Sequence, residues 1–213
     1  MKKRVFYCVL GLLAVVVIGC GKKGASQATP RETLDTLYDS VVDLDKSRYM
    51  SVLHGTDAEL EAASVLMDYF IAISDFRRAV EKEYGSTGWE HFEGGGGAQL
   101  TVDLAERKEK LDSAKIEVTG EKASCTIPGE RQVMHLCQKK GLWYIEAGTL
   151  VNTGGADTGK FTTMWKQMTE LIKSKQKRVG QPGVTAESLD AEMGNELIRI
   201  LMTAQFGIEP PSE

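Results

Sequence analysis

The stretch that decides the fold runs from Ile116 to Ala147 and reads IEVTGEKASCTIPGERQVMHLCQKKGLWYIEA. Apolar and polar residues alternate in its short runs, a period typical of strands with one buried face. Turn sequences at 119–122, 128–131 and 139–141 separate these runs. Because consecutive strands joined by short turns pair antiparallel, we expect a meander of three or four strands.

Helical signals precede this meander. The tetrad Thr29–Glu32 predicts a helix start, with threonine as N-cap and proline at the first helical position. A second, shorter helix is expected around 49–53. Thr56 is the next cap candidate, for a long helix that ends near Tyr84. The chain therefore places its first helices ahead of the sheet.

Two segments predict irregular structure. Residues 86–98 contain four consecutive glycines, which hold regular structure poorly, and we expect a loop there. A short helix around 102–111 follows it. After the strands comes a glycine-rich link at 148–160.

Two further helices are expected beyond this link. Apolar residues recur at helical spacing over 161–172 and 189–204, and Thr185 is a cap for the second helix. The expected fold class is α+β, with N-terminal helices packed on a small curved antiparallel sheet and two C-terminal helices appended. We expect one domain over 31–206 and a frayed tail at 207–213.

The N-terminus has the pattern of a targeting signal. Lys2, Lys3 and Arg4 precede an apolar run at 5–18, too short to span a bilayer but suited to a signal-peptide core. The run ends in Val17-Ile18-Gly19-Cys20, which resembles the lipobox of bacterial lipoproteins. The resemblance implies that residues 1–19 are removed and that the new N-terminal residue, Cys20, is acylated.

This resemblance also implies a location. Gly21 follows the acylated cysteine, where many double-membraned bacteria use aspartate to mark inner-membrane retention. The expectation is a cell-envelope protein anchored by lipid, in the outer membrane and facing the periplasm. Residues 20–30 are poor in apolar side chains and are expected to form a flexible tether.

The net charge of the chain excludes one class of binding partner. The chain has 26 Lys and Arg against 30 Asp and Glu, which excludes a strongly basic nucleic-acid binder. Signal cleavage removes three positive charges and no acids, so the formal charge falls from −4 to −7. The lipid, not a basic patch, is therefore expected to anchor the protein. His54, His91 and His135 lack zinc-ligand spacing, so no metal and no cofactor are expected.

The body resembles the nuclear transport factor 2-like superfamily, whose members are α+β cones with helices in the concave face of a sheet. The matching segments are Thr29–Glu32, Gly120–Cys125 and Gly141–Ile145. The resemblance covers about 29–150, so 31–150 would be cone-like. The low strand content and the helical extension at 160–206 depart from it, and a helical domain with a small sheet competes with it.

A cone implies a pocket between helices and sheet. Its candidate lining residues are Tyr38, Phe70, His91 and Trp143. Glu146 alternates away from Ile145 and is expected on the surface. No catalytic constellation emerges from these residues.

One near-motif resembles a phosphate-binding loop. Gly154, Gly159 and Lys160 have its spacing, but Phe161 replaces the hydroxyl that binds magnesium. A flexible linker is the favoured interpretation.

Whether two of the cysteines form a disulfide depends on the strand register. Cys8 departs with the signal and Cys20 carries lipid, so Cys125 and Cys137 remain, on adjacent strands in an oxidising compartment. If the hairpin centres on Arg131, the two cysteines face each other. If Cys125 points inward together with Met134, Cys137 points outward and no bond forms.

The sequence thus favours a lipid-anchored, non-enzymatic binding or interaction module with an envelope protein as its partner. A small-ligand-binding cone, or an enzyme with a pocket between helices and sheet, is the alternative. A concave apolar cavity would distinguish the alternative.

Overall fold

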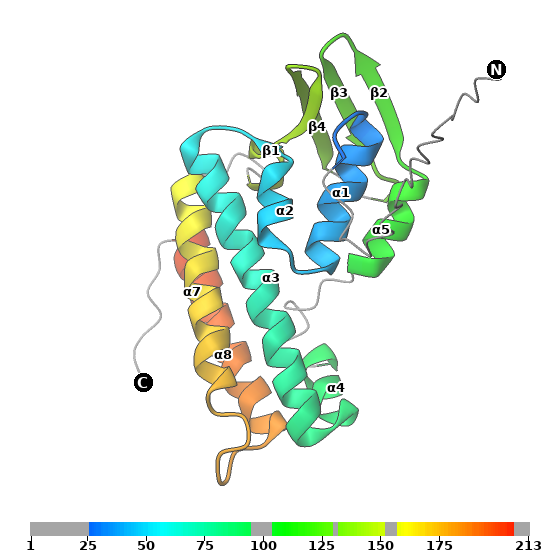
Figure 1. The fold of residues 1–213 in the computed structure, drawn as a ribbon. Helices are drawn as coiled ribbons and strands as arrows, with labels where there is room; N and C mark the ends of the chain where they lie inside the picture. Colours follow the sequence, from blue (N-terminus) through cyan, green and yellow to red (C-terminus); the bar gives the residue numbers. More distant parts are fainter. Residues whose placement is uncertain (1–25, 95–103, 130–131, 152–156, 207–213) are drawn as a thin grey trace, which may run out of the picture.

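The computed structural model describes residues 26–94, 104–129, 132–151 and 157–206. Its elements are α1 (Pro30–Val42), α2 (Lys46–Ser51), β1 (Leu53–His54), α3 (Asp57–Tyr84), α4 (Ser86–Gly94), α5 (Leu104–Asp112), β2 (Lys115–Thr119), β3 (Lys122–Thr126), β4 (Val133–Lys139), β5 (Leu142–Glu146), α6 (Gly148–Val151), α7 (Thr158–Gln176) and α8 (Ala186–Phe206) (Figure 1). The predicted α+β class is confirmed. The signal segment, Cys20 and the tail at 207–213 lie outside the described residues.

The helix caps lie where the sequence places them. The Thr29 side chain accepts a hydrogen bond from the Glu32 amide, and Pro30 opens α1. Thr56 and Glu59 form a reciprocal capping box at the start of α3. Among the described helices, none is long and apolar enough to cross a membrane.

The sheet has the order β1-β5-β4-β3-β2. Strands β2 to β5 form the predicted antiparallel meander. The two-residue β1 adds parallel to β5, with Leu53 opposite Ile145, so the sheet is mixed rather than purely antiparallel. This strand replaces the end of the helix expected at 49–53, since α2 stops at Ser51. Two residues are too few for alternation to predict a strand.

A first hydrophobic core lies between one sheet face and the helices α1, α2, α3 and α5. Its members include Leu34, Leu37 and Tyr38 from α1, Tyr49 from α2, Ala62, Ala63 and Met67 from α3, Leu111 from α5, and Cys125, Leu136, Trp143 and Ile145 from the strands. The opposite sheet face carries polar side chains such as Lys122, Ser124 and His135, together with the exposed apolar residues Val133 and Leu142.

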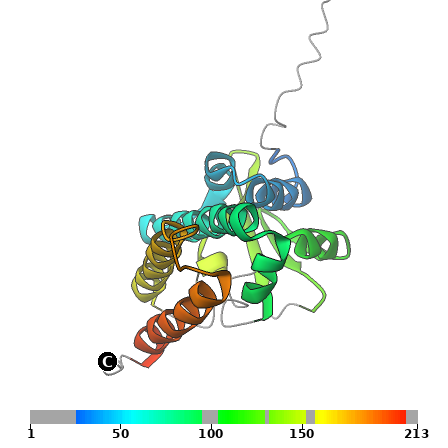
Figure 2. The same ribbon diagram turned by 90° about the horizontal axis from the view of Figure 1, so that it is seen from below.

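A second hydrophobic core joins the lower half of α3 to α4, α7 and α8. It is built around Tyr69, Phe76, Phe92, Ile172 and Leu189, all fully buried. Viewed from below, α7 and α8 lie to one side of α3 and α5 to the other (Figure 2). The 28 residues of α3 span about 42 Å, so this one helix runs through both cores.

Helix α4 replaces the first part of the loop expected at 86–98, and positions 95–98 lie outside the described residues. Trp89 and Phe92 lie one turn apart and are both buried, at 3% and 0% exposure. Phe76 on α3 meets both rings, with centroids 6.0 Å and 5.1 Å away. A β-carbon on Gly88 would lie 2.6 Å from the β-carbon of Tyr84, so glycine permits the close approach of α4 to α3. Tertiary burial of the aromatic pair thus overrides the weak local helix propensity.

The strand register is the one in which Cys125 points inward together with Met134. Cys125 lies opposite Met134 and points into the first core, whereas Cys137 lies opposite Lys122 on the other face. The two thiols thus lie on opposite faces of the sheet, and the Cys125–Cys137 disulfide is not formed. Burial raises the pKa of the Cys137 thiol, with a smaller contribution from the charge of Glu146.

Candidate functional site

The four residues expected to line a cone pocket do not meet in one site. Tyr38 and Trp143 are packed in the first core, and Phe70 is half-buried between the two cores. His91 is exposed on α4, because Trp89 and Phe92 occupy the buried side of that helix. The first core fills the space where a concave pocket was expected.

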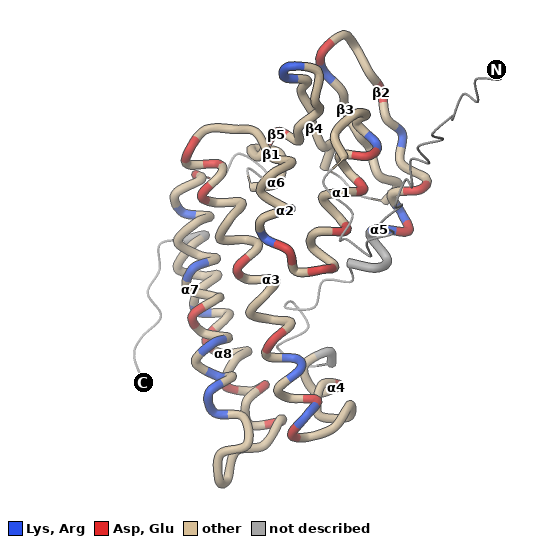
Figure 3. Tube along the Cα trace, in the orientation of Figure 1, with Lys and Arg blue, Asp and Glu red and all other residues tan. Residues whose placement is uncertain are grey.

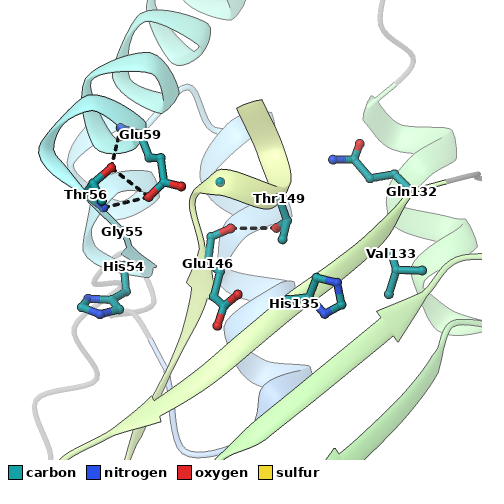
Figure 4. Close-up of a pocket in the computed structure, with 10 residues that line it drawn as sticks. His54, Gly55, Thr56, Glu59, Gln132, Val133, His135, Glu146 and Thr149 are labelled. Carbon is teal, nitrogen blue, oxygen red and sulfur yellow. Dashed lines mark hydrogen bonds between the residues drawn. The ribbon is translucent and has the colours of Figure 1, made fainter. Parts of the chain in front are cut away.

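A different cavity lies on the polar sheet face, where β4, β5 and the start of α3 meet (Figure 4). Its volume is about 690 Å³. Its lining residues are His54, Gly55, Thr56, Glu59, Gln132, Val133, His135, Glu146, Gly148 and Thr149. We call this cavity the outer-face site.

Three strands bring its titratable side chains together. His54 on β1 is the register partner of Glu146 on β5. On β4, Leu136 pairs with Ile145, so His135 lies on the other side of Glu146. Ile145 is buried, and alternation turns Glu146 to the outer face. In Figure 4 the Glu146 side chain lies between those of the two histidines.

Hydrogen bonds fix the frame of the site. The His54 carbonyl accepts from the Ala147 amide at 2.8 Å, which holds β1 against β5. The Thr149 hydroxyl, on the short helix α6, donates to the Glu146 carbonyl at 2.7 Å. The backbone that carries His54 and Glu146 is therefore fixed by hydrogen bonds rather than belonging to a free loop.

Glu59 enters the site from α3. Its Oε2 accepts from the Thr56 amide at 2.8 Å and from the Thr56 hydroxyl at 3.0 Å. Two glycines give this carboxylate room, since a β-carbon on Gly148 would lie 2.4 Å from Glu59 Oε1 and one on Gly55 would lie 2.8 Å from Oε2.

We expect Gly148→Ala to displace the Glu59 carboxylate and to open the capping box. The loss should be about 1 kcal/mol of unfolding free energy, the usual contribution of a cap. Urea denaturation monitored by circular dichroism measures this change. In a Glu59→Ala background, Gly148→Ala should cost nothing further, and an equal cost in both backgrounds would contradict this packing.

The chemistry of the site suits binding of a polar group. Two imidazoles, two carboxylates and two threonine hydroxyls offer both donors and acceptors. His54 and His135 are exposed and Glu146 is only half-buried, whereas acid–base catalysts are tuned by desolvation. Across the described part of the chain, no three His, Cys, Asp or Glu side chains are grouped to hold a metal ion.

The near-motif for phosphate binding has a local structural role where it is described. Asp157 caps α7, and its carboxylate accepts from the Gly159 amide at 2.7 Å. In a phosphate-binding loop, this amide would be available to donate to the ligand, whereas here it donates to Asp157. A cavity of about 430 Å³ lies nearby, between the start of α7 and the end of α8. Gly154 lies outside the described residues.

No protein-family model, curated protein or solved structure matches this chain.

Proposed function

We propose that this protein is a lipid-anchored protein of the cell envelope, whose body is a non-enzymatic binding module for an envelope partner. The observation that carries the proposal is the sequence Val17-Ile18-Gly19-Cys20, which ends a basic and then apolar leader. Acylation of Cys20 with more than one chain would anchor it stably. Gly21 favours the outer membrane and the periplasmic side.

The start of the fold supports this arrangement. The Trp143 amide donates to the Gln27 carbonyl at 2.9 Å, and Gln27 Nε2 donates to the Trp143 carbonyl at 2.8 Å. The Thr36 hydroxyl donates to the Ser26 carbonyl at 3.1 Å. The tether expected over 20–30 is thus shorter, because its last part is bound to the body. The six Cα–Cα steps from Cys20 to Ser26 span about 20 Å at most, which would hold the body close to the bilayer.

Binding is favoured over catalysis by two features. Tyr38 and Trp143 are packed in the core, which speaks against the alternative of a ligand or substrate between helices and sheet. The hydrated His54 and His135 of the outer-face site suit recognition of a polar group better than proton transfer. The likeness to nuclear transport factor 2-like cones remains part of the proposal, supported by the packing of α1 against one face of the sheet.

The test is metabolic labelling with an alkyne-bearing palmitate in a bacterial host that expresses the full chain. Cys20→Ser should abolish the label completely. Cys8→Ser is the matched control, because it removes a cysteine within the leader and should leave the label unchanged. Retention of the label by Cys20→Ser would contradict the proposal.

A second candidate function is binding of a small polar ligand at the outer-face site. The observation that favours it is the placement of Glu146 between His54 and His135. A thermal-shift screen of polar metabolites tests it. A ligand should raise the melting temperature of the native protein, and Glu146→Gln should reduce that shift. An unchanged shift in Glu146→Gln would place the ligand elsewhere.

A further inference from the structure

We propose that the hairpin end of the sheet is a membrane-contact surface that rests on anionic lipid headgroups and sets the orientation of the body. We call this surface the hairpin tip and define it by Lys122, Lys139, Lys140 and Leu142, with Glu121 among them. The inference rests on the lipid anchor proposed above and adds which face meets the bilayer.

The strand register brings two turns together at the tip. The β2–β3 turn joins Thr119 to Lys122, and the β4–β5 turn joins Lys139 to Leu142. Both turns lie at the same end of the sheet, and the Gln138 amide donates to the Glu121 carbonyl at 2.8 Å between them. Figure 3 shows lysine positions in blue at this end of the strands.

The tip is locally basic in an acidic protein. Lys122, Lys139 and Lys140 are exposed, and in the described structure none of them has a carboxylate within ion-pair distance. Glu121 is the single acid of the two turns, so the tip has a net charge of about +2 by simple charge counting. Lys22 and Lys23 add two more positive charges between Cys20 and Ser26. Such lysines are attracted to anionic lipid only within about a Debye length of the surface, about 8 Å at physiological salt.

The tip also presents an apolar residue and a rigid turn. Leu142 is 43% exposed at the start of β5. Lys140 and Gly141 both have positive φ, at 52° and 82°. This two-residue turn favours asparagine before glycine, so Lys140 occupies a position where lysine is conformationally unfavourable. The lysines can keep their ammonium groups at the lipid headgroups while the exposed leucine contacts the edge of the acyl region, so the tip offers both kinds of contact.

The anchor ends beside this surface. Gln27 is hydrogen bonded to Trp143, the residue that follows Leu142. The segment back to Cys20 reaches about 20 Å when fully extended. In Figure 1, the end of the α7–α8 pair where the two helices join lies at the opposite end of the molecule from the hairpin tip. The hairpin tip is therefore the charged surface that a short anchor brings to the bilayer.

This orientation leaves the outer-face site accessible. Glu146 lies at the other end of β5 from Leu142, about 13 Å away at the rise of an extended strand. With the tip on the bilayer, that site would be held off the lipid surface.

The experiment uses the mature lipidated protein in phosphatidylcholine vesicles, with or without phosphatidylglycerol, that carry nitroxide-labelled lipid. A fluorophore is attached through Leu142→Cys in one sample and through Ile198→Cys in another. Ile198 is 59% exposed on α8 and serves as the distant reference. Cys125 and Cys137 are buried, and the unsubstituted protein gives their background labelling. In anionic vesicles, we expect quenching at position 142 to exceed that at position 198 by about two-fold or more.

A charge-matched pair of variants tests the lysines. Lys139→Gln with Lys140→Asn should reduce quenching at position 142 by about half in anionic vesicles, because the basic attraction is lost. Asparagine suits the left-handed turn, so this variant keeps the hairpin. Lys173→Gln with Lys177→Gln removes the same charge from the end of α7 and should leave the quenching unchanged.

Equal quenching at positions 142 and 198, or no effect of the Lys139 and Lys140 substitutions, would overturn the proposal. Vesicle flotation comes first and separates the two hypotheses. Protein that floats but fails the quenching test contradicts only the membrane-contact surface. Protein that does not float lacks its anchor, which overturns the proposed function and this inference with it.

Discussion

Replacing Phe76 with alanine is expected to lower the free energy of unfolding by about 3–5 kcal/mol. Phe76 is fully buried, and its ring makes edge contacts with Trp89 and Phe92 of α4. The substitution would leave a cavity where α3, α4 and α8 meet. Because α4 depends on these aromatic contacts rather than on its own propensity, we expect it to lose its order first.

Urea denaturation monitored by far-ultraviolet circular dichroism measures the loss, and hydrogen exchange identifies α4 as the weakened element. Lys82→Ala, at an exposed position of α3, is the control and should change stability by less than about 0.5 kcal/mol. A loss of under about 1 kcal/mol for Phe76→Ala would contradict the tight packing of the second core around this ring.

The second large effect is expected at the charged contact between α7 and α8. Lys175 is only 6% exposed, and its Nζ lies 2.9 Å from Glu192 Oε2 and 2.6 Å from Glu196 Oε1. Removing both acids as Glu192→Gln with Glu196→Gln leaves a buried ammonium without a counter-charge. We expect this double variant to lose about 3 kcal/mol.

A hydrophobic replacement is the matched control. Lys175→Met keeps most of the side-chain volume and removes the buried charge, so its stability should stay within about 1 kcal/mol of the parent. If both variants lose the same amount, the methylene packing and not the charge of Lys175 holds the helices together.

The stability that this charged contact contributes should change with pH in a definite direction. Hydrogen bonds from Arg178 and then Lys175 hold the pKa of Glu192 below its ordinary value of 4.5. The stabilisation that the ionised Glu192 provides is therefore complete above pH 4.5. It is lost as the pH falls through the lowered pKa of this carboxyl. Burial alone would lower the pKa of Lys175, but hydrogen bonds to Glu196 and Glu192 outweigh it and raise the pKa above its ordinary value of 10.5. Its contribution is thus complete below 10.5 and is lost only when the pH rises through the raised pKa.

Thermal unfolding at a series of pH values checks this sign. The parent protein should lose stability in acid more steeply than Glu192→Gln, which has no carboxyl to protonate at that position. Identical slopes would contradict the role assigned to Glu192.

Local signals explain which parts of the fold could be predicted from the sequence. The cap at Thr56 and the four meander strands depend on residues close in the chain, so spacing alone predicts them. Helix α4 and strand β1 could not be predicted in this way. Trp89 is buried through tertiary contacts such as the one with Phe76 of α3, and Leu53 becomes a strand residue by pairing with Ile145.

The same distinction applies to the candidate site. Alternation predicts that Glu146 faces outward, but its position between His54 and His135 depends on the addition of β1 beside β5. The resemblance to a cone suggested His91 and Trp143 as neighbours of a pocket. The structure instead packs Trp143 in the core and leaves His91 exposed on α4.

The most direct test of the lipid anchor is the mass of the N-terminal peptide of the mature protein, purified from bacterial membranes. The account predicts a peptide that begins at Cys20 and carries a thioether-linked diacylglycerol, with or without an N-acyl chain. A peptide that begins at Met1, or one that contains an unmodified Cys20 thiol, would contradict it.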